Sequence, residues 1–265
     1  MLSPEDFFDL ASFKHQSLLQ GKKYVWDSLK HLKEYMDCQS YSPLADFSRN
    51  GEPLSTTVVY YNDSFQDSRD LRIEFGDATK GKLSVYRDNE LLEGASVIMA
   101  GAVLLGERIE LGRSVLIEAG AMIKSPAIIG DWSEIRQGAY LRGYCLVGRR
   151  CVVGHVTEVK HSVFLDDAKA GHFAYLGDSI LGNEVNLGAG TKLANLRFTP
   201  GDVQIRTGDK PVPTGLRKLG AILADHVQTG CNSVTNPGTL LGRKSVLMPN
   251  TTASSGLHRP SSLIR

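Results

Sequence analysis

Aliphatic residues recur at every sixth position through the second half of the chain. Ten consecutive members of this series are Leu105, Leu111, Ile117, Ile123, Ile129, Ile135, Leu141, Val147, Val153 and Val159. A period of six fits neither an α-helix, whose period is 3.6, nor an ordinary long strand. It is typical of a β-helix of hexapeptide repeats, in which three units form a triangular turn of about 18 residues and the aliphatic side chains point inward.

The register continues beyond Val159 with one interruption. The inward positions are Phe164, Ala170, Leu176, Leu181, Leu187, Leu193 and, later, Leu223, Thr229, Thr235, Leu241 and Leu247, with intervals of five before Phe164 and before Leu181. Residues 197–218 are rich in Gly and Pro and predict an inserted loop that leaves the coil at a corner, where it covers a groove or reaches a neighbouring subunit. We therefore predict an all-β main domain over residues 99–250 and a C-terminal tail over 251–265.

Residues 1–98 follow a different pattern, which predicts a helical arm and a small β element. Residues 3–6 (Ser-Pro-Glu-Asp) favour a helix start, and apolar spacing predicts a second helix from Lys23 to Met36. Residues 39–56 are interpreted as a connector. Strands are expected at Thr56–Tyr61, Leu71–Phe75 and Leu83–Tyr86. We expect the helices to pack on the main body, with partner binding as the alternative.

Composition narrows the possible functions. The formal net charge is +1, which does not suggest nucleic acid as a partner. No apolar run reaches the roughly 20 residues of a membrane span, and the acidic N-terminus is not a secretory signal. The four cysteines, Cys38, Cys145, Cys151 and Cys231, have neither metal-ligand nor disulfide-scaffold spacing. They indicate reduced thiols in a cytoplasmic protein, and we interpret Cys231 as a small buried residue rather than a reactive thiol.

The repeat also predicts which polar side chains meet. Arg142 and Lys160 each follow an inward residue and lie one turn apart, without an acidic partner in register. Such a pair fits a phosphate cradle, with a solvated basic face as the alternative. His155 and His172 stack in the same way on a different face. His172 is a candidate general base, the alternative being an exposed corner histidine.

Residues from about 99 to 250 resemble a known family. The segments Glu158–Lys160, Lys169–His172, Tyr175–Asp178 and Val185–Gly190 are similar to the acetyltransferase site in the C-terminal, left-handed β-helix domain of the bifunctional N-acetylglucosamine-1-phosphate uridyltransferase/glucosamine-1-phosphate acetyltransferase. The resemblance implies a left-handed coil and a homotrimer with sites between subunits. It also implies acetyl transfer from acetyl-CoA to the amine of an amino-sugar phosphate, in nucleotide-sugar and cell-envelope precursor synthesis, with no metal required.

The same resemblance implies roles for individual residues. His172 is the general base, and Ala189 presents the backbone N–H that faces the thioester carbonyl. The expected sugar-phosphate ligands are Arg142, Lys160, Tyr175, Asn186 and Lys218. Asn195 and Cys231 fall at further positions on the cofactor side.

Departures from the family pattern keep other functions open. The uridyltransferase domain is absent, Leu196 replaces a tyrosine, and Cys231 replaces a serine that contacts the cofactor. A non-catalytic protein that binds sugar phosphates or nucleotide sugars is one alternative, and a long-chain acyltransferase that uses an acyl-carrier protein is another. A third is a β-helical carbonic anhydrase with zinc bound between subunits by His155, His161 and His172, which metal analysis would test.

Overall fold

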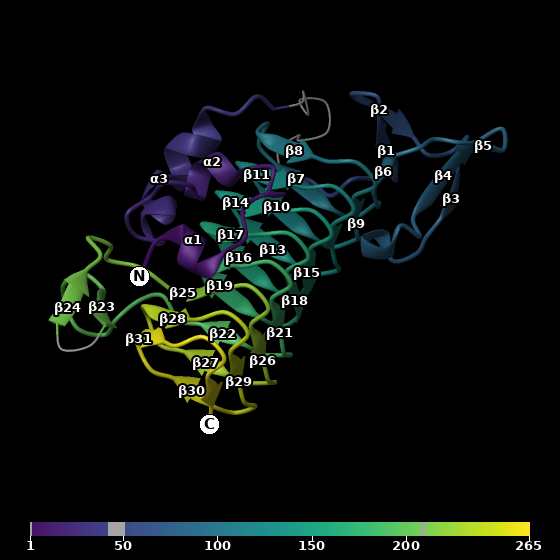
Figure 1. The fold of residues 1–265 in the computed structure, drawn as a ribbon. Coiled ribbons are helices and arrows are strands. Elements are labelled where there is room, and N and C mark those ends of the chain that lie inside the picture. Colours follow the sequence, from purple (N-terminus) through teal and green to yellow (C-terminus); the bar gives the residue numbers. More distant parts are fainter. Residues whose placement is uncertain (1, 42–50, 208–209) are drawn as a thin grey trace.

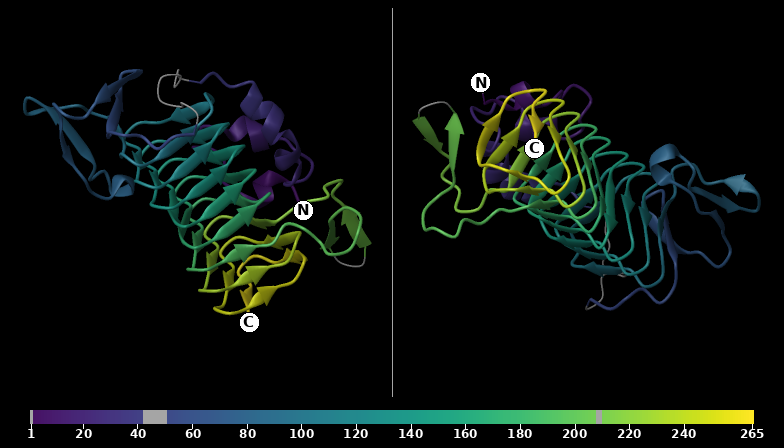
Figure 2. Two further views of the ribbon diagram at one scale, coloured as in Figure 1. Left: turned by 180° about the vertical axis from the view of Figure 1, so that it is seen from behind. Right: turned by 90° about the horizontal axis from the view of Figure 1, so that it is seen from below.

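The computed structural model describes residues 2–41, 51–207 and 210–265, and its main body is a three-walled coil of parallel strands (Figure 1). This confirms the predicted all-β, left-handed parallel β-helix. Each turn adds one short strand to each of three walls, and strands of successive turns pair in parallel. Figure 2 shows the coil from behind and from below.

We number the walls in chain order. Wall 1 contains β6 (Ser96–Ile98), β9 (Leu116–Ile117), β12 (Glu134–Ile135), β15 (Val152–His155), β18 (Lys169–His172), β21 (Asn186–Leu187), β26 (Gln228–Thr229), β29 (Val246–Leu247) and β32 (Leu263–Ile264). Wall 2 contains β7 (Val103–Leu105), β10 (Met122–Lys124), β13 (Tyr140–Arg142), β16 (Glu158–Lys160), β19 (Tyr175–Gly177), β22 (Lys192–Leu193), β27 (Val234–Thr235) and β30 (Thr252–Ala253). Wall 3 contains β8 (Ile109–Leu111), β11 (Ala127–Ile129), β14 (Cys145–Val147), β17 (Ser162–Phe164), β20 (Ile180–Leu181), β25 (Ala221–Leu223), β28 (Thr239–Leu241) and β31 (Gly256–His258).

The inward residues form the core as predicted, with one correction at the first turn. Leu141 pairs with Ile123 on one side and Val159 on the other, and all three side chains are buried. Ile123 pairs with Leu104, whereas the period of six predicts Leu105 as its partner. Leu104 is buried and Leu105 is half-buried, because the corner that begins at Gly106 contains one more residue than the repeat allows.

Wall 3 differs from the other walls because it is apolar on both sides. Its inward residues join the coil core, whereas its outward residues pack against the N-terminal helices. These buried outward residues are Ile128, Leu146, Val163, Ile180, Ile222 and Leu240. A strand covered on both faces has a continuous apolar sequence, as in Ala127–Ile129 and Cys145–Val147. The helical arm therefore packs on the main body, as expected.

Three helices form the cover of wall 3. They are α1 (Pro4–Phe7), α2 (Gln16–Leu19) and α3 (Asp27–Asp37). The backbone N–H and Oγ of Ser3 both donate to the Asp6 carboxylate at 2.9 Å, which confirms the predicted first helix start. The second predicted helix begins at Asp27 rather than Lys23, because the Asp27 carboxylate accepts the Tyr24 N–H at 3.2 Å and the chain before it forms a turn.

The small β element adjoins the first turn. Strand β1 (Val58–Tyr61) pairs antiparallel with β2 (Ser64–Asp67) and with β6, and thereby extends wall 1. A separate three-stranded sheet contains β3 (Arg72–Glu74), β4 (Ser84–Arg87) and β5 (Glu90–Leu91), with a short helix η1 (Ala78–Lys80) between β3 and β4. The three predicted strands are thus present. The predicted connector 39–56 lies partly outside the described residues.

The inserted loop leaves the coil at the corner between walls 2 and 3 and carries a hairpin of β23 (Gln204–Thr207) and β24 (Lys210–Pro213) (Figure 1). Val203 and Ile205 are buried, so the start of this hairpin packs on the coil. The predicted tail needs a correction. Strands β30, β31 and β32 lie within residues 251–265 and pair in register with the preceding turn, so the β-helix extends to Ile264.

Candidate active site

One group of candidate residues forms a column along the corner where each turn leaves wall 1. The carbonyl oxygens of His155, His172 and Ala189 each accept a backbone N–H from the next turn, at 2.7–3.0 Å. These residues follow the inward wall 1 residue by two places, and we call the set the histidine column: Gln137, His155, His172, Ala189 and Cys231. The structure therefore places His172, Ala189 and Cys231 on three successive turns.

The two imidazoles of the histidine column lie against each other. The ring centroids of His155 and His172 are 5.7 Å apart and the planes differ by 23°, so the predicted stacking is present. His172 is exposed and His155 is half-buried. Asn186 is also exposed on wall 1, where it pairs with Lys169 on the strand that carries His172. Because the His172 imidazole is exposed, it is accessible to a substrate.

The second group surrounds Asp178 at the corner between walls 2 and 3. Lys160 Nζ donates to both carboxylate oxygens at 3.1 Å, His161 Nδ1 donates to Oδ1 at 3.0 Å, and Asn195 Nδ2 donates to Oδ2 at 2.5 Å. Burial alone would raise the pKa of Asp178, but these hydrogen bonds and the Lys160 charge hold the pKa below its ordinary value. Asp178 is therefore an ionised centre that orients three neighbouring side chains.

Tyr175 completes this Asp178 network. Its hydroxyl donates to Asn195 Oδ1 at 3.4 Å. Burial, with a smaller contribution from the Glu158 charge, raises the pKa of Tyr175, so the hydroxyl keeps its proton at neutral pH. A Cβ atom at position 177 would collide with both the Asn195 amide and the Tyr175 hydroxyl, so Gly177 provides the space that these groups occupy.

The predicted cation pair needs a correction, because both cations have acidic partners. Arg142 Nη1 lies 2.6 Å from Glu158 Oε1, and Lys160 is paired with Asp178. The sequence reading missed these carboxylates, although Asp178 stands 18 residues after Lys160, one turn along the coil. The Arg142–Glu158 pair is 42% and 37% exposed, so a competing anion can replace the Glu158 carboxylate at small cost.

The inserted loop returns next to the Asp178 network. The N–H of Leu219 donates to the Asn195 carbonyl at 3.0 Å, and Lys218 forms a backbone bridge with Leu196. Lys218 is exposed at this point, close in the fold to Asn195. The structure thus brings together Lys160, Tyr175, Asn195 and Lys218, with Arg142 one turn away. It places His172, Ala189 and Cys231 at another corner, and Asn186 on wall 1.

Cys231 is exposed, which corrects its interpretation as a buried residue. It stands on the outer corner, two places after the inward Thr229, where no second wall covers it. All four cysteines are free thiols. Burial raises the pKa of Cys145 to about 12 and raises that of Cys151 further, so these two are unreactive core residues.

The histidines do not form a metal site within one chain. His161 donates to Asp178 at the corner between walls 2 and 3, whereas His155 and His172 stack on wall 1. Among the residues that the structure describes, no three His, Cys, Asp or Glu side chains converge in a way that could hold a metal ion. Nor is any helix in the described ranges long and apolar enough to cross a membrane.

These features define a left-handed parallel β-helix of hexapeptide repeats with polar clusters at two corners. The chain belongs to the family described as the GMPPB C-terminal domain, which matches residues 123–255. The matched range includes the histidine column and the Asp178 network.

Curated relatives confirm the resemblance predicted from the sequence. A bifunctional sugar-1-phosphate nucleotidylyltransferase/acetyltransferase of Sulfurisphaera tokodaii is 36% identical over 54% of this chain and 37% of its own length. The bifunctional protein GlmU of Methanococcus maripaludis strain C5 is 36% identical over 46% of this chain and 30% of its own length. GlmU of a Synechococcus species is 28% identical over 78% and 39%, respectively. The chain thus spans less than half the length of these relatives.

A solved acyltransferase structure is similar to this chain at low sequence identity. It is the UDP-N-acetylglucosamine acyltransferase of Francisella novicida, which is 12% identical and covers 63% of this chain and 65% of its own, with a TM-score of 0.37.

Proposed function

We propose that the protein is an acyltransferase that moves an acetyl group from acetyl-CoA to the amine of an amino-sugar phosphate such as glucosamine 1-phosphate. The observation that carries this proposal is the histidine column, in which an exposed His172 lies one turn from the backbone of Ala189. The word acetyltransferase in the name of the Sulfurisphaera relative supports it, because that relative is 36% identical to this chain over 149 residues.

The proposed reaction uses His172 as the general base. The imidazole takes a proton from the substrate ammonium, and the free amine attacks the thioester carbonyl. The Ala189 N–H stabilises the oxyanion of the tetrahedral intermediate, by about 3 kcal/mol for a well-placed donor. The C–S bond then breaks, the amide product forms, and the coenzyme A thiolate leaves and takes up a proton. No metal enters these steps.

The phosphate is bound by the second corner in this proposal. Lys160, Lys218 and Arg142 supply positive charge, and Tyr175 and Asn195 supply neutral hydrogen-bonding groups. Asn186 binds the sugar near the amine. The histidine column and the Asp178 network lie at different corners of one chain. We therefore propose a homotrimer in which the histidine column of one copy faces the Asp178 network of its neighbour. Val156 and Phe173, each 58% exposed beside the histidine column, give that interface its apolar contacts.

The test is a coenzyme A release assay with glucosamine 1-phosphate, galactosamine 1-phosphate and unphosphorylated glucosamine. We expect turnover with at least one phosphate, and a loss of about 10²- to 10⁴-fold in His172→Ala. His226→Ala is the matched control, since His226 is an exposed corner histidine that pairs with Glu184 outside the site. Equal activity in His172→Ala and His226→Ala would contradict the assignment of the base. Sedimentation of the wild type tests the trimer.

A second candidate is a non-catalytic protein that binds sugar phosphates. Specific observations favour it: Leu196 is 48% exposed beside Lys218 where the family pattern has a tyrosine, and the cations at the site are already paired with carboxylates. Saturable binding of glucosamine 1-phosphate without coenzyme A release from acetyl-CoA would support this candidate over the enzyme. Release from an acyl-carrier thioester alone would instead support the carrier-dependent alternative.

A further inference from the structure

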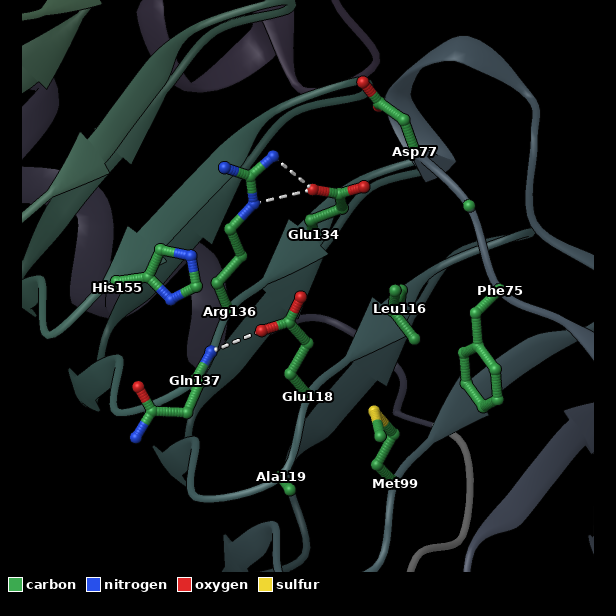
Figure 3. Close-up of a pocket in the computed structure, with 11 residues that line it drawn as sticks. Phe75, Asp77, Met99, Leu116, Glu118, Ala119, Glu134, Arg136, Gln137 and His155 are labelled. Atoms are coloured by element: carbon green, nitrogen blue, oxygen red, sulfur yellow. Dashed lines mark hydrogen bonds and ion pairs between the residues drawn. The ribbon is translucent and has the colours of Figure 1, made fainter.

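A cavity of about 650 Å³ lies between the small β element and the outer face of wall 1 (Figure 3). Residues 75–77, which follow β3, form one side of it. The other side is formed by Met99, directly after β6, and by strands β9, β12 and β15 with the residues that follow β9 and β12. A volume of this size suits a small-molecule ligand. Most of the cavity is built by residues before position 123, outside the range that the family matches.

One side of this cavity is apolar. Phe75 is 55% exposed, and in Figure 3 its ring lies beside Leu116 and Met99. Leu116 is buried at the base and Met99 is half-buried. An exposed aromatic ring on an apolar floor provides a flat surface for the C–H face of a ligand ring.

The opposite side is polar and carries the carboxylates of Glu118 and Glu134 and the guanidinium of Arg136. The buried Glu134 carboxylate accepts the Ala78 N–H at 2.7 Å and pairs with the Arg136 guanidinium at 2.7 Å. Glu118 accepts the Gln137 backbone N–H at 2.8 Å through Oε2, and no ion pair joins it to a cation within the described residues. The wall therefore offers a carboxylate acceptor and a guanidinium donor side by side.

The residue that directly follows the inward position on wall 1 changes along the coil, from large side chains beside the cavity to glycine beside His172. The residues directly after the inward position are Met99, Glu118 and Arg136 in the first three turns, whereas the next four turns have glycine there. A Cβ atom at Gly154 would collide with the Gly171 backbone, so the turns under His172 stack closely. The cavity ends at His155, whose ring stacks on His172.

The chemistry of the walls selects a class of ligand. Among the described residues that line the cavity, Asp77 pairs with Lys80 at 2.8 Å and Glu134 pairs with Arg136, so the Glu118 carboxylate is the charge left without an ion-pair partner. The Glu118 carboxylate repels phosphate, and the Arg136 guanidinium disfavours a cation. An uncharged ring with hydroxyls on its edge and C–H groups on its face matches the carboxylate, the guanidinium and the Phe75 ring. We propose that this cavity is a binding site for an uncharged hexopyranose unit. The proposal concerns binding alone and does not depend on acyl transfer.

The test is calorimetric titration of the full chain with methyl α-D-glucopyranoside, methyl α-D-mannopyranoside and N-acetylglucosamine, without an acyl donor. We expect saturable binding of at least one probe. Phe75→Ala and Glu118→Gln should each weaken it at least tenfold, and neither should change the melting temperature by more than the control. The matched control is Phe198→Ala, which removes a fully exposed ring near the base of the inserted loop and should leave binding unchanged.

Three outcomes would overturn the proposal. The first is the absence of binding by all three probes, and the second is equal binding by wild type, Phe75→Ala and Glu118→Gln. The third uses a Lys160→Ala background, which weakens the proposed sugar-phosphate site. If glucose 1-phosphate or adenosine binds more tightly there than every uncharged glycoside, and Phe75→Ala abolishes that binding, the cavity takes a phosphate or a nucleobase. None of these outcomes bears on coenzyme A release, so the two proposals fail separately.

Discussion

Walls 2 and 3 are built from the same repeat, yet their outer faces have different roles. Both walls point aliphatic residues into one core. The outer face of wall 3 is apolar and lies under the N-terminal helices, whereas the outer face of wall 2 carries Arg142, Glu158, Lys160 and Tyr175. The comparison shows that the two walls serve different purposes. The outward residues of wall 3 pack against the helices and stabilise the fold, whereas those of wall 2 remain available to ligands.

The largest effect that tests this comparison is expected on wall 3. Leu146 is fully buried between the wall and the helices, so Leu146→Ala leaves a cavity and should lower the free energy of unfolding by about 2–5 kcal/mol. The control on wall 2 is Lys192→Ala, an exposed outward position that should change stability by less than about 0.5 kcal/mol. Denaturant unfolding measures both. Equal losses in the two variants would contradict the separation.

The cover should also make stability depend on pH. Burial, and to a smaller extent the Lys14 charge, lowers the pKa of His15 to about 4, and the ring bonds the Tyr35 hydroxyl at 2.9 Å. Below pH 6.5 the unfolded chain takes up this proton first, so stability falls as pH decreases from 6.5 to 4. We expect a loss of about 2 kcal/mol between pH 7 and pH 5.

His15→Gln should remove most of that pH dependence while retaining a hydrogen-bonding group. Guanidinium titrations of wild type and variant at pH 7 and pH 5 measure the difference. The same slope in both proteins would show that another group causes it.

On wall 2 the expected effects are on ligand binding. Lys160→Met removes one positive charge from the Asp178 network, whereas the bonds from His161 and Asn195 to Asp178 remain. The KM for glucosamine 1-phosphate should rise about tenfold, as is typical when a hydrogen bond to a charged group is lost. The kinetics with unphosphorylated glucosamine should change little. An equal rise for both substrates would mean that Lys160 acts on folding rather than on the phosphate.

The smallest effect is expected at the exposed Arg142–Glu158 pair. Glu158→Gln should change stability by less than about 1 kcal/mol, because both side chains are solvated. It should strengthen the binding of glucosamine 1-phosphate by a few fold, since Arg142 loses a competing carboxylate. Glu184→Gln, at an exposed corner beside His226, is the control for a general change in net charge. Unchanged or weaker binding in Glu158→Gln would remove Arg142 from the proposed phosphate site.

The amino-acid sequence by itself determined the coil and much of its register. A period of six leaves one aliphatic residue per strand, and the stacking of Leu141 on Val159 and of His155 on His172 follows from counting residues. The sequence also contained the signal for Asp178, which lies one turn beyond Lys160. The sequence alone therefore predicts which residues stack on one another in successive turns.

Only the tertiary structure decided how distant segments use that coil. It showed that the helices cover wall 3 and that residues 251–265 continue the turns of the coil. It further showed that Glu158 and Asp178 form ion pairs with Arg142 and Lys160. It also showed the cavity under Phe75, where residues 75–77 meet wall 1. The physical reason is that the repeat acts between neighbouring turns, whereas packing across walls depends on side chains that are far apart in the sequence.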